Sequence, residues 1–202
     1  DWSMMTHGFV DVIYDHQGGP RGANKSFAAS MLMIQGSKSL ALGTVNLKGM
    51  FSLDPLMGKT GYPLLFQTGE TADGENRLID RQHPHNLVME LASSYSVPVS
   101  DKNAVFVYAG IVGEPAIGPT AFMHRLSGSD NPEAPISHHW LDSTHITNGV
   151  VTIGYTTPDW KFEGSTFHGR EPDQYRYRME LGALDSYSGR ITFNPNSDVS
   201  MQ

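Results

Sequence analysis

The chain has 202 residues, a formal net charge of -7 at pH 7 and no cysteine, and its mean hydropathy is -0.32. No segment approaches the ~18 consecutive apolar residues of a transmembrane helix, so the sequence excludes a helical membrane protein. The negative charge argues against nucleic-acid binding, which needs a basic face. No change in composition and no low-complexity linker divides the chain, so residues 1–202 are expected to form one domain.

Short polar turns alternate with long loops along the chain, and segments of β-type sequence separate them. Short turns are expected at 36–38, 100–103, 158–159 and 194–198, and long connections at 16–24, 54–85, 114–142 and 171–184. Short turns at one end of a meander and long loops at the other are typical of a membrane-spanning β-barrel. A strand that crosses a bilayer needs ~9 to 11 residues, which is about the length of the expected strands.

The first three expected strands lie between residues 7 and 51. In the first, Val10, Val12 and Tyr14 oppose His7, Asp11 and Asp15. In the third, Ala41, Val45, Leu47 and Phe51 oppose Thr44, Asn46 and Lys48, although Leu40, Leu42 and Met50 blur the alternation. The second strand, over 27–34, has two apolar faces and would fit a buried sheet equally well.

The fourth and fifth expected strands repeat these two patterns. Over 87–97, Leu87, Met89, Leu91, Tyr95 and Val97 oppose Glu90, Ser94 and Ser96. Over 104–112 both faces are apolar. A period of two therefore predicts one apolar and one polar face for the fourth strand, whereas the fifth, like the second, would fit a buried sheet equally well.

The last three expected strands show the alternation most clearly. Their apolar rows are Gly149, Val151, Ile153 and Tyr155, then Trp160, Phe162, Gly164 and Thr166, then Tyr187, Ile191 and Phe193. Their polar rows are Asn148, Thr152 and Thr156, then Lys161, Glu163 and Ser165, then Ser186, Ser188, Arg190 and Thr192. Tyr95, Tyr155, Trp160 and Phe193 lie near turns, where aromatic residues form interfacial girdles in barrels.

These patterns predict an all-β protein, an antiparallel up-and-down transmembrane β-barrel with about eight visible strands. The segment 199–202 has the sequence of a ninth strand, so the domain is expected to be incomplete at its C-terminus and to belong to a larger barrel. The alternative is a soluble sandwich, in which the same aromatic residues would form the core.

With Asp11, Lys48, Glu90, Lys161, Glu163 and Arg190 on an inner face, the chain resembles porin-like β-barrels of the Gram-negative outer membrane. Segments 78–85, 131–135, 137–140 and 169–173 are similar to those of a poorly characterised group of bacterial outer-membrane proteins. The resemblance implies a location in the bacterial outer membrane and the barrel topology, with transport by analogy only. Gln202 departs from the terminal aromatic residue that porin-like chains usually carry.

The histidines gather in the expected loops. Pro84 favours an extended backbone that would place His83 and His85 on one side, and His138, His139 and His145 form a second group. Imidazole ligands suit a transition metal such as zinc or copper, so these five histidines are the candidate metal site. In the alternative, the histidines hydrogen-bond the loop backbone and pack the loops into a plug.

The sequence predicts no catalytic residue. Ser143 lies near Asp142 and His145, but the nucleophile elbow Gly-x-Ser-x-Gly is absent, and adjacency in sequence does not define a triad. Met31 and Met33 share one strand face, where packing explains them better than thioether binding of copper.

We therefore expect a channel or transport protein for small polar solutes or ions, not an enzyme. Its lumen would be lined by the six charged residues of the inner face, and its partners would be the lipid bilayer and small polar solutes or metal ions, not nucleic acid. The solute and the oligomeric state stay open. The rivals are a histidine-rich metal-binding outer-membrane protein and a secreted β-sandwich that binds carbohydrate through Trp140 and Tyr175.

Overall fold

A computed structural model describes residues 1–125, 127–136, 138, 146–170 and 172–202. Nine strands form one antiparallel sheet in the order β1-β2-β3-β6-β7-β8-β9-β10-β11. Their bounds are β1 Ser3–His16, β2 Asn24–Leu40, β3 Gly43–Phe51, β6 Val88–Pro98, β7 Ala104–Val112, β8 Val150–Thr156, β9 Trp160–Phe167, β10 Ser186–Asn196 and β11 Val199–Met201. The fold is therefore all-β and each strand pairs with its neighbours along the sheet, as the sequence predicts.

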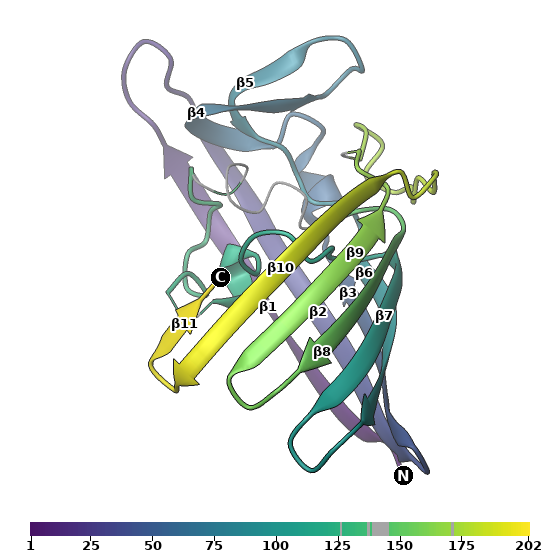
Figure 1. The fold of residues 1–202 in the computed structure, drawn as a ribbon. Helices are drawn as coiled ribbons and strands as arrows, with labels where there is room; N and C mark the ends of the chain where they lie inside the picture. Colours follow the sequence, from purple (N-terminus) through teal and green to yellow (C-terminus); the bar gives the residue numbers. More distant parts are fainter. Residues whose placement is uncertain (126, 137, 139–145, 171) are drawn as a thin grey trace.

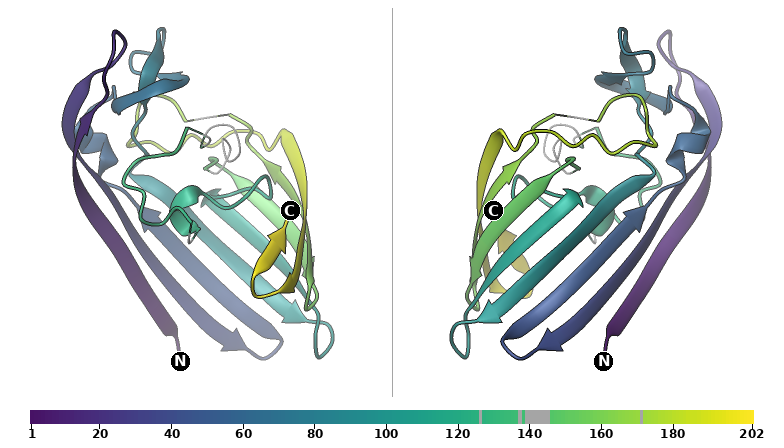
Figure 2. Two further views of the ribbon diagram at one scale, coloured as in Figure 1. Left: turned by 90° about the vertical axis from the view of Figure 1, so that its left-hand side faces the viewer. Right: turned by 90° about the vertical axis from the view of Figure 1, so that its right-hand side faces the viewer.

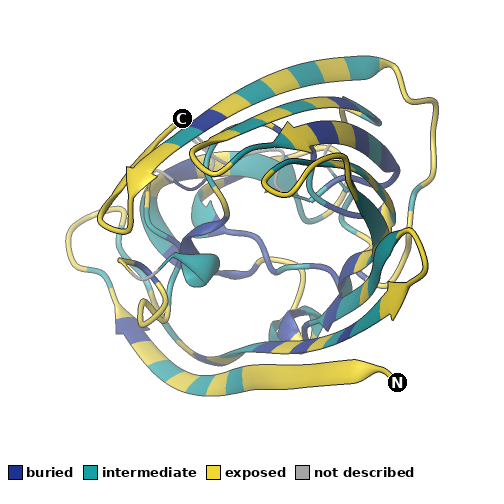
Figure 3. Cartoon of the chain, turned by 60° about the horizontal axis from the view of Figure 1, so that its bottom comes forward, coloured by how far each residue is buried: buried dark blue, intermediate teal, exposed yellow. Residues whose placement is uncertain are grey.

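The sheet curls around a central space (Figure 3), but it does not close into the barrel that the sequence predicts. Its two edges are β1 and β11, which are not neighbours in the strand order. No helix in the described part of the chain is long and apolar enough to cross a membrane.

Short and long connections lie at opposite ends of the sheet (Figure 1). The turns at 41–42, 99–103, 157–159 and 197–198 lie at the end that also holds the N-terminus, and the long connections lie at the other end. One expected turn is wrong, because residues 36–38 continue β2. A Cβ on Gly36 would lie 3.2 Å from the Trp2 ring, so this glycine makes room for an aromatic side chain rather than for a turn.

The outer face of the sheet carries the predicted apolar rows. Ile153 is 66% exposed, Trp160 41% and Phe162 42%. Among the described strands no second sheet covers this face, since β4 and β5 form a separate hairpin beyond the end with the long loops (Figure 2). Near the short turns the Trp160 ring stacks on Phe162 and on Phe193, with centroids 6.0 and 4.3 Å apart.

The inner face of β2 packs against the loops, which explains why both faces of this strand are apolar. Met31 and Met33 form a buried cluster there with Met50 of β3 and Met89 of β6. The prediction for Met89 is wrong, since it was placed on the apolar row with Leu91. The β3–β6 register shifts between Met50 and Phe51, and a β-bulge of this kind changes the face that a side chain reaches.

The long connections carry structure of their own inside and above the sheet. They hold two 3-10 helices, η1 (Asp54–Met57) and η2 (Phe122–His124), and the hairpin of β4 (Tyr62–Thr71) and β5 (Arg77–Gln82). The hairpin was not predicted. Its signal was the dipeptide Asp73-Gly74, a common hairpin turn, in which Gly74 has φ +86° and the Asp73 carboxylate accepts the N–H groups of Glu75 and Asn76.

Candidate functional site

A polar cavity of about 440 Å³ lies against the inner face of the sheet. Five of the six predicted pore-lining residues line it: Lys48, Glu90, Lys161, Glu163 and Arg190. The sixth, Asp11, is half-buried on the inner face of β1 but does not line this cavity. The period-two pattern therefore brings five of the six predicted charges into one space, although they come from four different strands.

On one side of the cavity, two cations share one carboxylate. Lys161 Nζ lies 2.7 Å from Glu163 Oε1, and Arg190 Nε lies 2.8 Å from Glu163 Oε2. The sheet register explains the contact, because Glu163 of β9 is paired directly with Arg190 of β10. Lys161 also lies over the Phe106 ring, with Nζ 5.1 Å from the centroid. We call Lys161, Glu163 and Arg190 the basic triad.

On the other side, a lysine and a tyrosine hold a second carboxylate. Lys48 Nζ lies 2.7 Å from Glu90 Oε2, and the Tyr108 hydroxyl donates to Glu90 Oε1 at 2.8 Å. The backbone N–H of Glu114 in turn donates to the Tyr108 hydroxyl at 3.1 Å. Glu90 of β6 is thus held by neighbours from β3 and β7.

The beginning of the β7–β8 connection folds inward and narrows the cavity. Ala116 N donates to Ser165 Oγ at 2.8 Å, and Arg190 Nη1 donates to the Gly118 carbonyl at 3.0 Å. The sequence does not predict this inward course, because 114–142 shows only the composition of a long connection. Sequence reasoning also missed Phe106 and Tyr108, which were counted among the apolar residues of 104–112.

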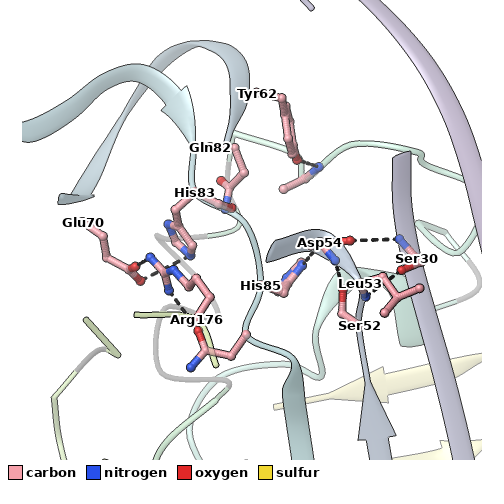
Figure 4. A network of polar contacts seen from close by, with 12 residues as sticks. Ser30, Ser52, Leu53, Asp54, Tyr62, Glu70, Gln82, His83, His85 and Arg176 are labelled. Atoms are coloured by element: carbon pink, nitrogen blue, oxygen red, sulfur yellow. Dashed lines mark hydrogen bonds and ion pairs between the residues drawn. The ribbon is translucent and has the colours of Figure 1, made fainter. Parts of the chain in front are cut away.

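The loops above the cavity contain a second set of charges, shown in Figure 4. Asp54, at the start of η1, accepts hydrogen bonds from His85 Nδ1 and from Ser30 N, both at 2.9 Å. Burial acts to raise the pKa of the Asp54 carboxyl, but these hydrogen bonds outweigh it and the pKa lies below its usual value. The contact ties two loop segments to β2.

A buried arginine joins the β4–β5 hairpin to the last long loop. Arg176 forms an ion pair with Glu70 of β4, and its Nη1 donates to Asn86 Oδ1 at 3.2 Å. His83 Nε2 lies 3.3 Å from the same Glu70 carboxylate. Burial lowers the pKa of Arg176 to about 10. We call Asp54, Glu70, His83, His85 and Arg176 the loop network.

The predicted metal site is divided in this arrangement. His83 contacts Glu70 and His85 contacts Asp54, so the two histidines reach different carboxylates. His138 is buried with its ring 6.2 Å from that of His85, centroid to centroid, while His139 and His145 lie outside the described residues. Within the described ranges no group of three His, Asp or Glu side chains is arranged to hold a metal ion.

The remaining candidates of the sequence fall into two groups. Trp140, Asp142 and Ser143 lie outside the described residues. Tyr175 is exposed on the last long loop, where Arg178 lies 4.4 Å and Lys59 5.0 Å from its ring centroid.

Three comparisons with known proteins were negative: no family model, no curated protein and no solved structure matches the chain. The inferences about function therefore depend on the sequence pattern and on the geometry of the curved sheet.

Proposed function

We propose that this protein is a β-barrel of the bacterial outer membrane that acts as a passive channel for small polar solutes or ions. The observation that carries the proposal is the division of a single curved sheet into an exposed apolar outer face and an inner face with a charged cavity. A soluble sandwich would instead bury the apolar face of its sheet against a second one.

The outer face supports a location in lipid. Val10, Val12, Ile153, Phe162 and Ile191 lie on the outward rows of four strands and are exposed. An apolar surface that extends across neighbouring strands is costly in water, and it is what the hydrocarbon layer requires of a barrel. The stacked Trp160 and Phe193 near the short turns suit one interfacial girdle.

The proposal makes a demand on the two edges of the sheet. Backbone N–H and C=O groups in hydrocarbon must be hydrogen-bonded within the protein, so β1 and the β10–β11 edge must both be paired in the membrane. The outward row of β1, including Val12, then lies in the same apolar belt as the outward rows of the strands between the two edges.

Transport would be passive and controlled by the shape and charge of the lumen. The basic triad faces the Lys48–Glu90 pair across the cavity, and the inward segment at 114–118 narrows the path. Selectivity in such a pore follows its width and the placement of its charges. No covalent step and no cofactor enters this mechanism.

Membrane insertion is tested by two variants that place an arginine on opposite faces of the sheet. Ile153→Arg places a charge on the outer row, and Ser94→Arg places the same charge in the polar cavity. We expect Ile153→Arg to destabilise the folded protein in vesicles, lowering its free energy of unfolding by about 2 to 4 kcal/mol if the site lies near the midplane. Ser94→Arg should cost much less, and equal costs would contradict a lipid-facing outer row.

Channel activity is tested by conductance across planar bilayers. Glu90→Gln removes an anionic group from the lumen and should shift the selectivity toward anions, whereas Arg190→Gln should shift it toward cations. The control is Lys102→Gln, a change of charge in the turn between β6 and β7, outside the cavity. Absence of any conductance by the folded protein would contradict the channel.

The histidines support a second proposal, a metal-binding outer-membrane protein. The specific observation is the approach of His85 to the buried His138, within 6.2 Å between ring centroids. Protein without a purification tag should then bind zinc or copper, and the double variant His83→Ala/His85→Ala should bind less. Equal metal content in both proteins would contradict this proposal and would leave the channel unaffected.

A further inference from the structure

The basic triad points to a class of solute. We propose that the cavity binds small hydroxylated carboxylates, with the carboxylate at Lys161 and Arg190. This inference rests on the proposed channel function and specifies the solute that the lumen favours.

The basic triad has a net charge of +1, because it contains two cations and one carboxylate. Lys161 and Arg190 carry two positive charges, and both are paired with the single carboxylate of Glu163, at 2.7 and 2.8 Å. Glu163 is almost completely buried beneath them, whereas the two cations are partly exposed to the cavity. An incoming anion therefore meets the cations and not the carboxylate.

The two cations retain the capacity to bind another oxygen. An ammonium has three donors and a guanidinium five N–H donors. Among the described residues, the one ion-pair partner of Lys161 is Glu163, and the acceptors of Arg190 are Glu163 and the Gly118 carbonyl. A carboxylate is the small anion that both groups recognise well by charge-assisted hydrogen bonds.

The rest of the cavity lining favours a ligand that carries hydroxyl groups over a ligand with an apolar body. Ser94, Ser96, Asn46 and Thr156 present hydroxyl and amide groups to the cavity, and Phe106 offers an aromatic face beside the triad. Its volume of about 440 Å³ is in the range of sites for small organic ligands. The carboxylate of Glu90 is held at Tyr108, away from the basic triad, and so repels the carboxylate of a ligand toward β9 and β10.

The test uses three solutes with one six-carbon polyhydroxylated chain and different ends: gluconate with a carboxylate, sorbitol with a hydroxyl and glucamine with an amine. Efflux of each labelled solute is measured from vesicles that contain the folded full chain, with potassium and valinomycin present to balance charge. We expect gluconate to leave fastest and glucamine slowest, with about three- to fivefold between gluconate and sorbitol, as for a partly exposed charge contact.

Two variants move this ratio in opposite directions. Arg190→Gln leaves one cation on Glu163 and should abolish the preference for gluconate, whereas Glu163→Gln leaves two unpaired cations and should increase it. Lys102→Gln removes a positive charge outside the cavity and should leave the ratio unchanged. Folding of each variant is checked first by its heat-modifiable migration in gels.

The outcomes separate this inference from the channel itself. If all three solutes pass at equal rates, the channel stands and the preference for carboxylates is wrong. If Lys102→Gln changes the ratio as much as Arg190→Gln, the preference comes from overall charge and the triad site is wrong. If no solute passes and no conductance is seen, the proposed function fails.

Discussion

The charged cavity and the loop network both contain ion pairs between a cation and a glutamate, but the two regions differ in how far the cation is exposed. In the loops, the side chain of Arg176 is 4% exposed and its carboxylate partner Glu70 is buried as well. In the lumen, Glu163 is equally buried, yet Lys161 is 38% exposed. Burial of the carboxylate is thus common to both regions, and access to the cation is confined to the lumen.

The difference has a physical consequence for function. A buried cation has lost its water and depends on its protein partners, so its ion pair fixes the positions of two loops. A cation at a water-filled cavity keeps part of its hydration and can exchange water for a solute. The loop network is therefore suited to hold the loops together, and the basic triad is suited to contact a solute in the cavity, as the proposed channel requires.

The largest expected effect is at Arg176. Arg176→Met leaves Glu70 buried without its main counter-charge, and we expect a loss of about 3 to 5 kcal/mol in the stability of the loops. The double variant Arg176→Met/Glu70→Gln removes both charges and should recover much of this loss. Hydrogen exchange of the β5–β6 connection, whose Leu87 N–H donates to the Arg176 carbonyl at 2.8 Å, provides the measurement.

The matched change in the lumen is Arg190→Met. Its partner Glu163 keeps the ion pair with Lys161, and water from the cavity can solvate the carboxylate. Hydrogen exchange in β9 and β10 of Arg190→Met should therefore change much less than hydrogen exchange in the loops of Arg176→Met. Equal losses at the two sites would show that exposure of the cation does not distinguish them.

A smaller effect is expected from pH through Asp54. Because the folded pKa of Asp54 is lowered, its ionised form stabilises the fold above the unfolded pKa of about 3.9, and this contribution is lost as the pH falls through the folded pKa. Protection of the Ser30 amide should therefore decline below about pH 4 in the native chain. Asp54→Asn should show lower protection at pH 6, by about 1 to 3 kcal/mol, and a flatter decline.

Asp101→Asn is the control for this experiment. Asp101 lies exposed in the turn between β6 and β7, at the opposite end of the sheet from η1. The variant should reproduce the native pH dependence at Ser30. If Asp54→Asn keeps the native pH dependence, another group is responsible and the assignment to Asp54 is wrong.

The sheet wall could be predicted from the sequence because its rule is local. Val10, Val12 and Tyr14 alternate with polar residues, and a period of two is sufficient to place them on the outer face. The rule fails at Met89, where one shift in register turns the side chain inward. A bulge depends on the partner strand, so a single strand's sequence gives no sign of it.

The loops could be predicted only in part because their contacts are not local. Pro84 indicates the extended backbone at His83 and His85, but the carboxylates that these histidines reach come from β4 and η1. The inward course of 114–118 depends likewise on Ser165 and Arg190, far along the chain. Composition identified these loops as rich in histidine, and only the tertiary structure shows which group each histidine contacts.

The smallest expected effect on stability is at the tip of the loops, where Arg21 pairs with Asp80. Two contacts of 2.6 and 2.7 Å join them, and Asp80 also accepts the N–H of Phe66. The Arg21 side chain is 58% exposed, so water screens its charge and Arg21→Ala should leave the unfolding midpoint unchanged. Phe66 and Asp80 both have positive φ angles, of 71° and 54°, which non-glycine residues seldom adopt. The pair nevertheless has a local role, because its hydrogen bonds hold these two residues in this backbone conformation.

Arg21→Ala should therefore act on the β4–β5 hairpin alone. The hydrogen bond from Arg21 lowers the pKa of Asp80, so in the variant this pKa should move back toward its ordinary value in a carboxyl NMR titration. Protease cleavage near Phe66 should become faster, and Phe66→Gly, which removes the steric cost of the positive φ, should slow it again. A lowered global midpoint in Arg21→Ala would mean that even an exposed ion pair holds the loops together, and the distinction between buried and accessible cations would then lose its physical basis.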